Sequence, residues 1–520
     1  MNTPEKKSFL FAIIVAFGGF IFGLDAAVIS GTVRFITEEF GLDELQVGTV
    51  VSAPGLGVLF ALPLASFVCN RYGRKASLIL VAALYLVSAV TSAIAPSFLT
   101  LVAARFVGGL AFCSLTLAAM YIGEVAPANW RGKLVATNQI NIVVGLSGAY
   151  FVNLLILNAS DSGAGWVQAI GIEQYTWRWM LGSEIVPAII WLGLLFLVPE
   201  SPRWLVFKGR EGDARKALER IGYSDQIEQE IKSIKSSMVG HEDEPLVKQL
   251  GELFSPRLRM VVIVAFTFAV VQQATGINAI LFYAPTVFEQ LGGGTDTAFV
   301  QAVWVGVVSV IFTFLSLAFV DRAGRRPMVI VGLLWVITSL LVCTYGFKSA
   351  EYTLTSDSLV ELQEHLEDPS LLEPMVGSVY GSDIEFKRAL EETLGEEVAR
   401  AKSSELIEQA VDINNNLILF GVLSFIAAFQ FSIGPIMWVV FSEIFPTSIR
   451  GAAIPAFVLI SSVTSYIVQM FFPWQLSNMG AGDIFLTYAG FVAVGFVVIV
   501  PLLPETKNLT IEQIQAKLKI

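Results

Sequence analysis

Long apolar stretches separated by short polar connections dominate the chain. Crossing a hydrocarbon core about 30 Å thick takes about 20 apolar residues, and the stretches 9–28, 78–95, 185–198 and 329–346 approach or reach that length. Backbone amides in lipid must be satisfied within their own segment, so each stretch is predicted to be a helix. The predicted spans are 9–30, 46–69, 76–95, 98–122, 133–157, 179–198, 258–289, 298–320, 327–347, 414–441, 452–473 and 482–503.

Composition supports an all-α membrane protein with twelve transmembrane helices. The 520 residues are 55% hydrophobic and 15% charged, and the mean hydropathy is +0.68. A soluble interior of this size could not bury so much apolar surface, so the lipid bilayer is the predicted surrounding. The first apolar stretch is long and lacks a small-residue cleavage site after it, which predicts a retained helix and not a signal peptide.

The distribution of lysine and arginine predicts the topology. An even number of spans places both termini on one side of the membrane. With the termini in the cytoplasm, about 25 of the 33 basic residues also fall in the cytoplasm, as the positive-inside rule requires. We therefore expect a multi-pass protein of the cytoplasmic (inner) membrane with both termini inside.

Two polar segments are too long to be ordinary connections. Residues 199–257 show helical periodicity and mixed charge, which predicts a cytoplasmic helical linker between a half at 1–198 and a half at 258–520. Residues 348–412 hold sixteen acidic and five basic residues, about the whole net charge of −11. Apolar residues recur there every four positions, at Phe386, Leu390, Leu394 and Val398, and predict one amphipathic helix in an extracytoplasmic insert. A solvated lid or spacer and a binding role both remain open for this insert.

Two short motifs occur twice. Residues 70–75, NRYGRK, recur as DRAGRR at 321–326, and an E-x-x-P-x-x-x-R-G pattern begins at both Glu124 and Glu443. The two offsets are 251 and 319 residues, and their difference of 68 is close to the length of the acidic insert, which lies between the two later motifs. The chain is therefore predicted to form two pseudo-symmetric six-helix bundles, an architecture in which a central site is exposed alternately to the two faces.

The repeated motifs predict an inner gate. They place arginines and acids where helices end on the cytoplasmic side, and such groups can pair across helix ends and hold the gate shut. The alternative is that the basic residues only enforce topology. The predicted gate residues are Arg71, Arg74, Glu124, Arg131, Asp321, Arg322, Arg325, Glu443 and Arg450.

Charged residues are scarce inside the predicted helices. A charge at bilayer depth costs several kcal/mol, so Asp25, Arg105 and Glu184 are expected to face the protein interior and to have a function. If Asp25 pairs with Arg105, protonation of Asp25 would neutralise it, free Arg105 and give a proton-driven two-state switch. A permanently ionised structural bridge is the alternative.

Uncharged amides cluster in the seventh span. Gln272, Gln273 and Asn278 surround Gly276, which can loosen the helix, and Tyr283 follows. Amides and aromatic faces suit a ligand made of hydroxyl groups, which both donate and accept hydrogen bonds. Interhelical polar contacts are the other interpretation. Further candidates are Gln139 in the fifth span and Gln430, Gly434, Pro435 and Trp438 in the tenth.

The sequence contains few residues that could bind a metal or act as catalysts. Cys69, Cys113 and Cys343 lie in or beside apolar segments without metal-like spacing, and His241 and His365 stand alone in the polar segments. We expect no metal site, no cofactor, no nucleic-acid partner and no enzyme activity, because the membrane-embedded acids have no histidine, metal cluster or nucleophile beside them. A monomer is the expected functional unit.

Four longer motifs stand out: GLDAAVISG at 23–31, PESPRWL at 199–205, QQ at 272–273 through Asn278 to FYAP at 282–285, and PETK at 504–507. They resemble the signatures of the sugar porter family of the major facilitator superfamily. Together they cover nearly the whole chain except 348–412, and it is their combination that is specific. The resemblance implies the major facilitator fold and a sugar site at the interface of the halves, with Gln139, Gln272, Gln273, Asn278 and Trp438 as hydrogen-bonding or stacking residues.

The resemblance also implies proton coupling. Proton-coupled members carry residues that match Asp25, Arg105 and Glu184, whereas facilitative glucose carriers usually have a neutral residue at the first position. The expected function is therefore proton-coupled monosaccharide symport by alternating access. An uncoupled sugar uniporter, a polyol or cyclitol symporter and, more remotely, a sugar-sensing receptor are the alternatives.

The sequence departs from the family pattern at several positions. Asn70 and Ser66 replace the usual aspartate and glycine of the first arginine loop, so the inner gate of the first half could be looser. Leu146, Ile433, Ser461 and Ser462 stand at or near positions where a coupled member has glutamine or tryptophan. Such a pocket has fewer amides and less stacking surface, so it could take a different or larger polyhydroxy solute.

Overall fold

The computed structural model describes residues 3–126, 130–223, 227–238, 246–362, 366, 368–395, 398–399, 402–446, 448–509 and 511–518. Within them, twelve helical segments are long and apolar enough to cross a membrane, and each predicted span overlaps one of them. The predicted fold class is therefore confirmed. The segments are Lys6–Gly31, Glu44–Ala65, Arg74–Ala93, Phe98–Val125, Thr137–Ser160, Thr176–Leu195, Pro256–Phe282, Gly294–Ala323, Arg325–Lys348, Asn415–Ile444, Arg450–Asn478 and Ala481–Leu502.

The chain divides into two compact units. Unit 1 comprises Met1–Ala27, Ala53–Ala149 and Arg178–Glu252, and unit 2 comprises Val28–Ser52, Tyr150–Trp177 and Leu253–Ile520. Two segments from the first half of the sequence thus belong to the same unit as the C-terminal helices. The division into halves at 198 and 257 stays a prediction.

Unit 1 is all helical. It holds all or most of α1 (Thr3–Val28), α3 (Glu44–Tyr72), α4 (Arg74–Ala93), α5 (Phe98–Ala111), α6 (Ser114–Val125), α7 (Arg131–Ser160), α9 (Thr176–Gly182), α10 (Ile185–Leu195), α11 (Pro202–Phe207), α12 (Glu211–Ile221), α13 (Ile227–Met238) and α14 (Leu246–Leu253). Its core includes the buried rings of Tyr85, Tyr121 and Trp191. The Trp191 indole donates to the Ile14 carbonyl at 2.9 Å, which ties α10 to α1.

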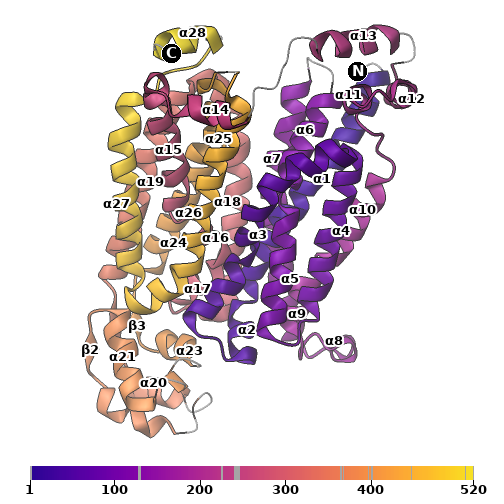
Figure 1. Cartoon of the computed structure of the whole chain (residues 1–520). Coiled ribbons are helices and arrows are strands. Elements are labelled where there is room, and N and C mark those ends of the chain that lie inside the picture. The colour runs from indigo at the N-terminus through magenta and orange to yellow at the C-terminus, as the bar shows by residue number, and fades with distance from the viewer. Residues whose placement is uncertain are drawn as a thin grey trace. The chain divides into compact units, whose positions relative to one another are not determined.

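Unit 2 contains the remaining elements (Figure 1). These are η1 (Ile29–Gly31), α2 (Val33–Phe40), α8 (Gly165–Ile170), η2 (Pro256–Leu258), α15 (Arg259–Ala274), α16 (Ile277–Phe282), α17 (Ala284–Glu289), α18 (Gly294–Ala323), α19 (Arg325–Lys348), β1 (Glu351–Thr353), α20 (Ser356–Glu361), η4 (Pro369–Met375), β2 (Val379–Tyr380), α21 (Asp383–Leu394), α23 (Ser403–Glu408), β3 (Val411–Asp412), α24 (Asn415–Phe431), α25 (Ile433–Ile444), α26 (Arg450–Asn478), α27 (Ala481–Leu502) and α28 (Ile511–Leu518).

Four membrane segments are interrupted within the described residues, three of them where polar residues lie. The helix breaks between α5 and α6, between α9 and α10, between α15 and α16, and between α24 and α25. Gly276 at the third of these breaks has φ +79°, and a Cβ there would lie 2.2 Å from the Tyr488 ring, so only glycine fits. Broken helices are used in transporters to free backbone groups for a binding site, and the breaks therefore mark where the site is expected.

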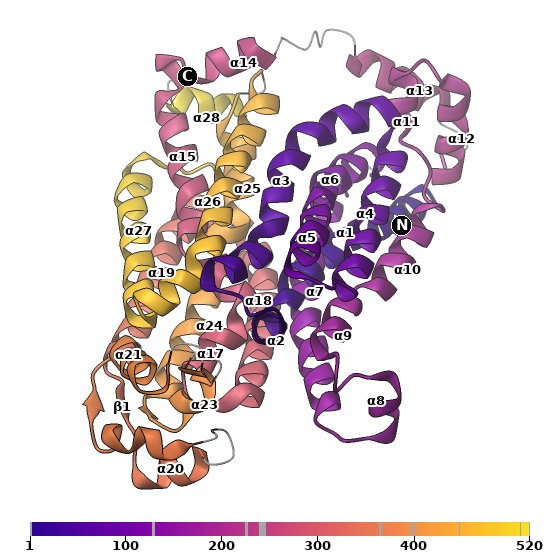
Figure 2. The ribbon, with the colours of Figure 1, turned by 60° about the horizontal axis from the view of Figure 1, so that its bottom comes forward.

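The acidic insert folds as a small α/β subdomain. Its three short strands form an antiparallel sheet in the order β2-β1-β3. Tyr352 on β1 stacks on Phe386 of α21 with the ring centroids 5.6 Å apart, inside a separate apolar core. The subdomain lies at the end of the unit 2 helices opposite α28 (Figure 1, Figure 2), so a cytoplasmic C-terminus would make the insert extracytoplasmic.

The predicted helix in the insert is only partly right. Phe386 and Leu390 are buried on α21 as expected, but the helix ends at Leu394 because Gly395 has φ +84°. Val398 lies beyond that end and is 43% exposed. The strands were not predicted, because two- and three-residue strands give no alternating pattern.

Ion pairs and hydrogen bonds hold the insert to other parts of unit 2. The Arg34 guanidinium of α2 contacts Glu405 of α23 at 2.9 Å and also donates to the Thr295 hydroxyl of α18. Lys387 of α21 donates to the Gln290 side chain at 3.0 Å. The insert is thus docked on the helices and is not a free tether.

The sheet register allows a clean deletion of the insert. Because Glu351 and Asp412 are directly paired, a short Gly-Ser linker can replace residues 352–411. We predict that the shortened protein inserts in the membrane and that its rate of sugar uptake stays within about twofold of that of the full-length protein. This is the result expected if the insert is only a spacer. Arg34→Gln alone is the control for the lost ion pair. Loss of uptake in a properly folded deletion protein, with Arg34→Gln active, would instead make the insert a lid.

Candidate functional site

Asp25 and Arg105 form an ion pair inside unit 1. Asp25 lies near the end of α1 and Arg105 in the middle of α5, and their side chains are 1% and 2% exposed. One guanidinium nitrogen, Nη1, contacts the Asp25 Oδ1 atom, and Nη2 donates to the Asp25 backbone carbonyl at 3.3 Å. An ion so deeply buried is stable only when it is paired, and removing one partner would leave an uncompensated charge.

Glu184 completes this buried charge cluster. It lies at the break between α9 and α10, is 3% exposed, and interacts electrostatically with both Asp25 and Arg105. The Arg105 guanidinium is thus paired with Asp25, and Glu184 adds a second buried carboxyl group to the same electrostatic cluster. Asp25 Oδ2 and Glu184 Oε1 are buried and accept no hydrogen bond from the described residues. Because like charges at one buried site disfavour double ionisation, binding of one proton would make the cluster neutral.

A second cluster, made of amides, lies at the break between α15 and α16 in unit 2. The Gln272 side-chain amide donates to the Gly434 carbonyl of α25 at 3.1 Å, and Gln273 donates to Gln272 at 3.0 Å. Asn278 donates to Gln273 at 2.8 Å and to the Ser465 hydroxyl of α26 at 2.7 Å. Gln272 is 4% exposed, whereas Gln273 and Asn278 are half-buried. The structure thus joins the predicted amides in one network.

The other predicted substrate residues are dispersed. Gln430 on α24 is 6% exposed and accepts from the Thr313 hydroxyl at 3.4 Å. Trp438 on α25 is 47% exposed. Gln139 is half-buried on the part of α7 that belongs to unit 1. Their contact with a ligand stays a prediction.

Tyr283 has a structural partner. Pro473 lies inside α26 and has no backbone N–H, so it leaves the carbonyl of Gln469, four residues earlier, without a helical donor. The Tyr283 hydroxyl donates to that carbonyl at 3.1 Å, and its ring lies 5.1 Å from the Phe472 ring. Tyr283 is 1% exposed. Its hydroxyl hydrogen is therefore already used, and only the oxygen lone pairs could serve a ligand.

The first repeated loop forms a closed polar network at the start of α4. The Arg74 guanidinium pairs with Glu124 of α6 at 2.8 Å. The backbone N–H groups of Arg74 and Lys75 donate to one oxygen of Glu200 at 2.9 and 3.0 Å. Gly73 precedes them with φ +98°, and a Cβ there would lie 2.3 Å from the Glu200 carboxylate. Glycine is thus required for the carboxylate to reach the helix end.

The second loop repeats this arrangement in unit 2. Arg325 pairs with Glu443 of α25 at 3.0 Å. The backbone N–H groups of Arg325 and Arg326 donate to the two oxygens of Glu505, both at 3.1 Å. Gly324 has φ +92° and matches Gly73. The sequence repeat therefore reflects a structural repeat.

Glu200 and Glu505 were not among the predicted gate residues. Each carboxylate accepts hydrogen bonds from the first N–H groups of a membrane helix. The helix dipole also stabilises a negative charge at that end. The signal was present in the sequence, because both acids follow a proline in the motifs PES and PET.

The remaining gate residues have varied surroundings. Asp321 pairs with Arg325 at 3.2 Å but is 82% exposed, and Arg450 donates to the Phe445 carbonyl at 3.0 Å. Arg71 and Arg322 are exposed and form no ion pair among the described residues. The side chain of Arg131 lies outside the described residues, as do His241 and His365.

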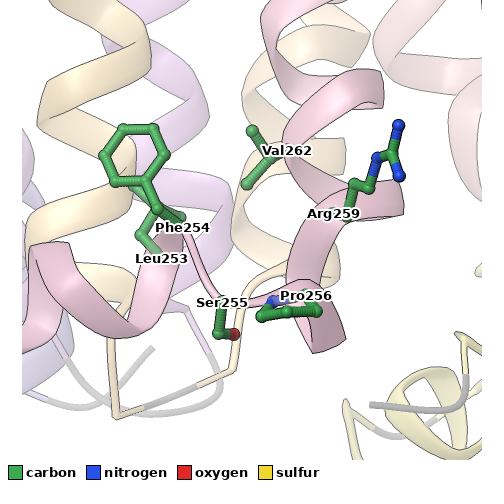
Figure 3. Close-up of a pocket in the computed structure, with 6 residues that line it drawn as sticks. All are labelled: Leu253, Phe254, Ser255, Pro256, Arg259 and Val262. Carbon is green, nitrogen blue, oxygen red and sulfur yellow. The ribbon is translucent and has the colours of Figure 1, made fainter.

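An apolar cavity of about 300 Å³ lies at the start of α15. Figure 3 shows its lining residues, which include Phe254, Pro256, Arg259 and Val262. None of the predicted substrate residues lines it. Its apolar walls offer little to a ligand made of hydroxyl groups, so we assign it no role in sugar binding.

The carboxylate at the start of α4 is expected to contribute to stability. Glu200→Gln keeps the shape and one acceptor oxygen but removes the charge, so we predict a loss of about 0.3–1 kcal/mol, the usual contribution of a charge at a helix N-terminus. Thermal unfolding of the purified protein should show a lowered Tm, and Glu505→Gln should act similarly on unit 2. Glu211→Gln, which breaks an exposed pair with Lys235, is the matched control and should change little. Unchanged Tm values for both loop variants would contradict the capping role.

Comparisons with known proteins agree over the whole chain. The model of the family described as "Sugar (and other) transporter" matches residues 11–357 and 398–518, so most of the acidic insert lies outside it. The D-xylose-proton symporter of Escherichia coli K12 is 31% identical and the arabinose-proton symporter of Bacillus subtilis 29%; each alignment covers 99% of this chain and 97% of the relative.

Solved structures give the same result. The xylose transporter of E. coli in an inward-open conformation is similar with a TM-score of 0.73 at 28% identity, covering 98% of this chain and 99% of that chain. The proton:xylose symporter bound to 6-bromo-6-deoxy-D-glucose gives a TM-score of 0.68 at 29% identity, with 98% and 99% covered. The fold, the buried charge cluster and the repeated loops are thus accompanied by similarity along the full length, and the chain belongs to the sugar transporter family of the major facilitator superfamily.

Proposed function

We propose that this protein is a proton-coupled monosaccharide symporter that works by alternating access in the cytoplasmic membrane, as a monomer with both termini inside. The observation that carries the proposal is the buried cluster of Asp25, Arg105 and Glu184, in which Arg105 pairs with one of two buried acids and the three residues come from three membrane segments. Relatives named as proton symporters for arabinose and xylose support the same activity.

The proton step follows from charge balance in the cluster. With both carboxyls ionised the cluster carries one net negative charge, which is costly in a low-dielectric interior. A proton that enters from the outside neutralises it and weakens the hold of Asp25 on Arg105. Release of that proton to the cytoplasm restores the ion pair. The protonation state thereby biases which conformation is populated.

The sugar step uses the amide network. Gln272, Gln273 and Asn278 provide donors and acceptors at a helix break, and Gln139, Gln430 and Trp438 are proposed to complete the site from other helices. Sugar hydroxyls replace water on these groups without leaving buried polar atoms unsatisfied. The two repeated loops, at Arg74 and at Arg325, are proposed to keep the cytoplasmic helix ends of each unit rigid while access to the site changes.

A polyol or cyclitol substrate is the second candidate. Ser461 of α26 lies 3.4 Å from the Gln272 side chain, and both Ser461 and Ser462 are small. Short side chains there leave room for a ring with a further substituent. A substrate screen by thermal shift separates these ligands, because a bound ligand raises the Tm by mass action.

Asp25→Asn tests the proton role. The amide cannot ionise, so we predict that accumulation of sugar against a gradient is lost while counterflow exchange across proteoliposomes continues. Both assays use the same vesicles and the same substrate, so misfolding would remove both signals. Accumulation that persists in the variant would refute a proton role for this carboxyl.

Gln272→Ala tests the amide network. Removing a buried polar contact should weaken substrate binding by about 1–3 kcal/mol, roughly five- to 150-fold in Kd. Gln168→Ala is the matched control, because Gln168 is exposed on α8 and is not in the network. Titration of purified protein measures both variants. Unchanged affinity in Gln272→Ala would move the sugar site elsewhere.

A further inference from the structure

One face of α26 continues the amide network beyond the residues predicted from the sequence. Ser461, Ser465 and Gln469 are spaced four residues apart, so they lie on one side of the helix. Ser461 contacts Gln272, and Ser465 accepts from Asn278 at 2.7 Å. Gln469 is the next residue along this polar face and is 4% exposed.

The backbone at Gln469 is fixed by an unusual pair of contacts. Pro473 removes the helical donor for its carbonyl, and the Tyr283 hydroxyl replaces that donor at 3.1 Å. Tyr283 follows α16, which carries Asn278. The Tyr283 contact therefore fixes the position of the Gln469 backbone relative to the amide network.

Ser465 and Gln469 together keep one hydrogen-bond donor and one acceptor without a partner among the described residues. The Ser465 oxygen accepts from Asn278 and from the Gln469 amide, the latter at 2.6 Å, which uses both lone pairs of a hydroxyl. Its own O–H has no acceptor among the described residues. The Gln469 Oε1 atom likewise accepts from none of the described residues.

We propose that Ser465 and Gln469 form a further hydroxyl-binding subsite that determines substrate specificity. A hydroxyl group needs one acceptor and one donor, and Gln469 Oε1 with the Ser465 O–H offers this pair. Gln469 lies eight residues, about 12 Å along the helix axis, beyond Ser461, which contacts Gln272. The subsite therefore reads a different hydroxyl from the one held by Gln272 and Gln273. This inference rests on the proposed sugar or polyol transport.

A deoxy scan tests the subsite without assuming the orientation of the ligand. The probes are the best-bound sugar from the screen and its complete set of monodeoxy analogues, titrated against wild type and Gln469→Met, which keeps a similar length but has no amide. Loss of one hydrogen bond should weaken binding about three- to tenfold. We expect the variant to bind the parent sugar that much more weakly and to treat the parent and one particular analogue alike, while discrimination at the other positions persists.

Two further variants make the result decisive. Ser465→Ala removes the donor of the subsite with a smaller change in volume and should lose discrimination at the same hydroxyl position, even if Gln469→Met does not fold. Thr464→Val is the matched control, because the Thr464 hydroxyl is bound to the Ile460 carbonyl of its own helix at 3.0 Å; its profile should equal that of wild type.

The outcomes separate this inference from the proposed function. Wild-type discrimination profiles in both Gln469→Met and Ser465→Ala would overturn the subsite, and so would an equal loss for every analogue, which indicates a structural role. If Gln272→Ala still weakens all the ligands in that case, sugar binding stands and only the subsite fails. A wild-type protein that binds no sugar or polyol would remove both.

Discussion

The burial of two acids and one base among three membrane segments is the constraint from which the rest of the mechanism follows. Asp25, Arg105 and Glu184 are each at most 3% exposed. A charge at this depth is stable only beside its partner, so the proton count of the cluster and the packing of α1 and α5 are linked. A carrier can use such a link, because a change of one proton alters the stability of one arrangement of helices relative to another.

The broken helices and the two repeated loops contribute to this switch in different ways. Breaks beside Glu184, Gly276 and Ser432 place polar groups inside segments that are otherwise apolar. At the starts of α4 and α19, Glu200 and Glu505 each accept from the first N–H groups of the helix and lie beside an arginine–glutamate pair. Helix breaks in the interior and capped helix ends together suit helix bundles that move as rigid bodies around a central site.

Much of this fold could be predicted from the sequence, because apolar length is a strong signal in a membrane protein. The twelve spans, the amide cluster and the repeat of Arg74 and Arg325 were all visible as patterns. The strands of the insert were not, because they are two or three residues long. The capping role of Glu200 was missed, since it depends on a glycine 127 residues earlier in the chain.

The site was predictable in composition but not in geometry. Spacing marked Gln272, Gln273 and Asn278, yet their link to Ser465 and Gln469 depends on how α26 packs against α16. The partner of Tyr283 is a backbone carbonyl released by Pro473, and a proline in a sequence does not say which side chain will replace the lost donor.

Sugar-driven proton movement is the most direct measurement of the proposed coupling. Proteoliposomes or cells are held in weakly buffered medium, a transported sugar is added without any imposed gradient, and the external pH is followed with a glass electrode or a dye. Coupled entry predicts an immediate rise in external pH that is abolished by a protonophore and absent in Asp25→Asn. Entry of the sugar with no change in pH would contradict proton coupling.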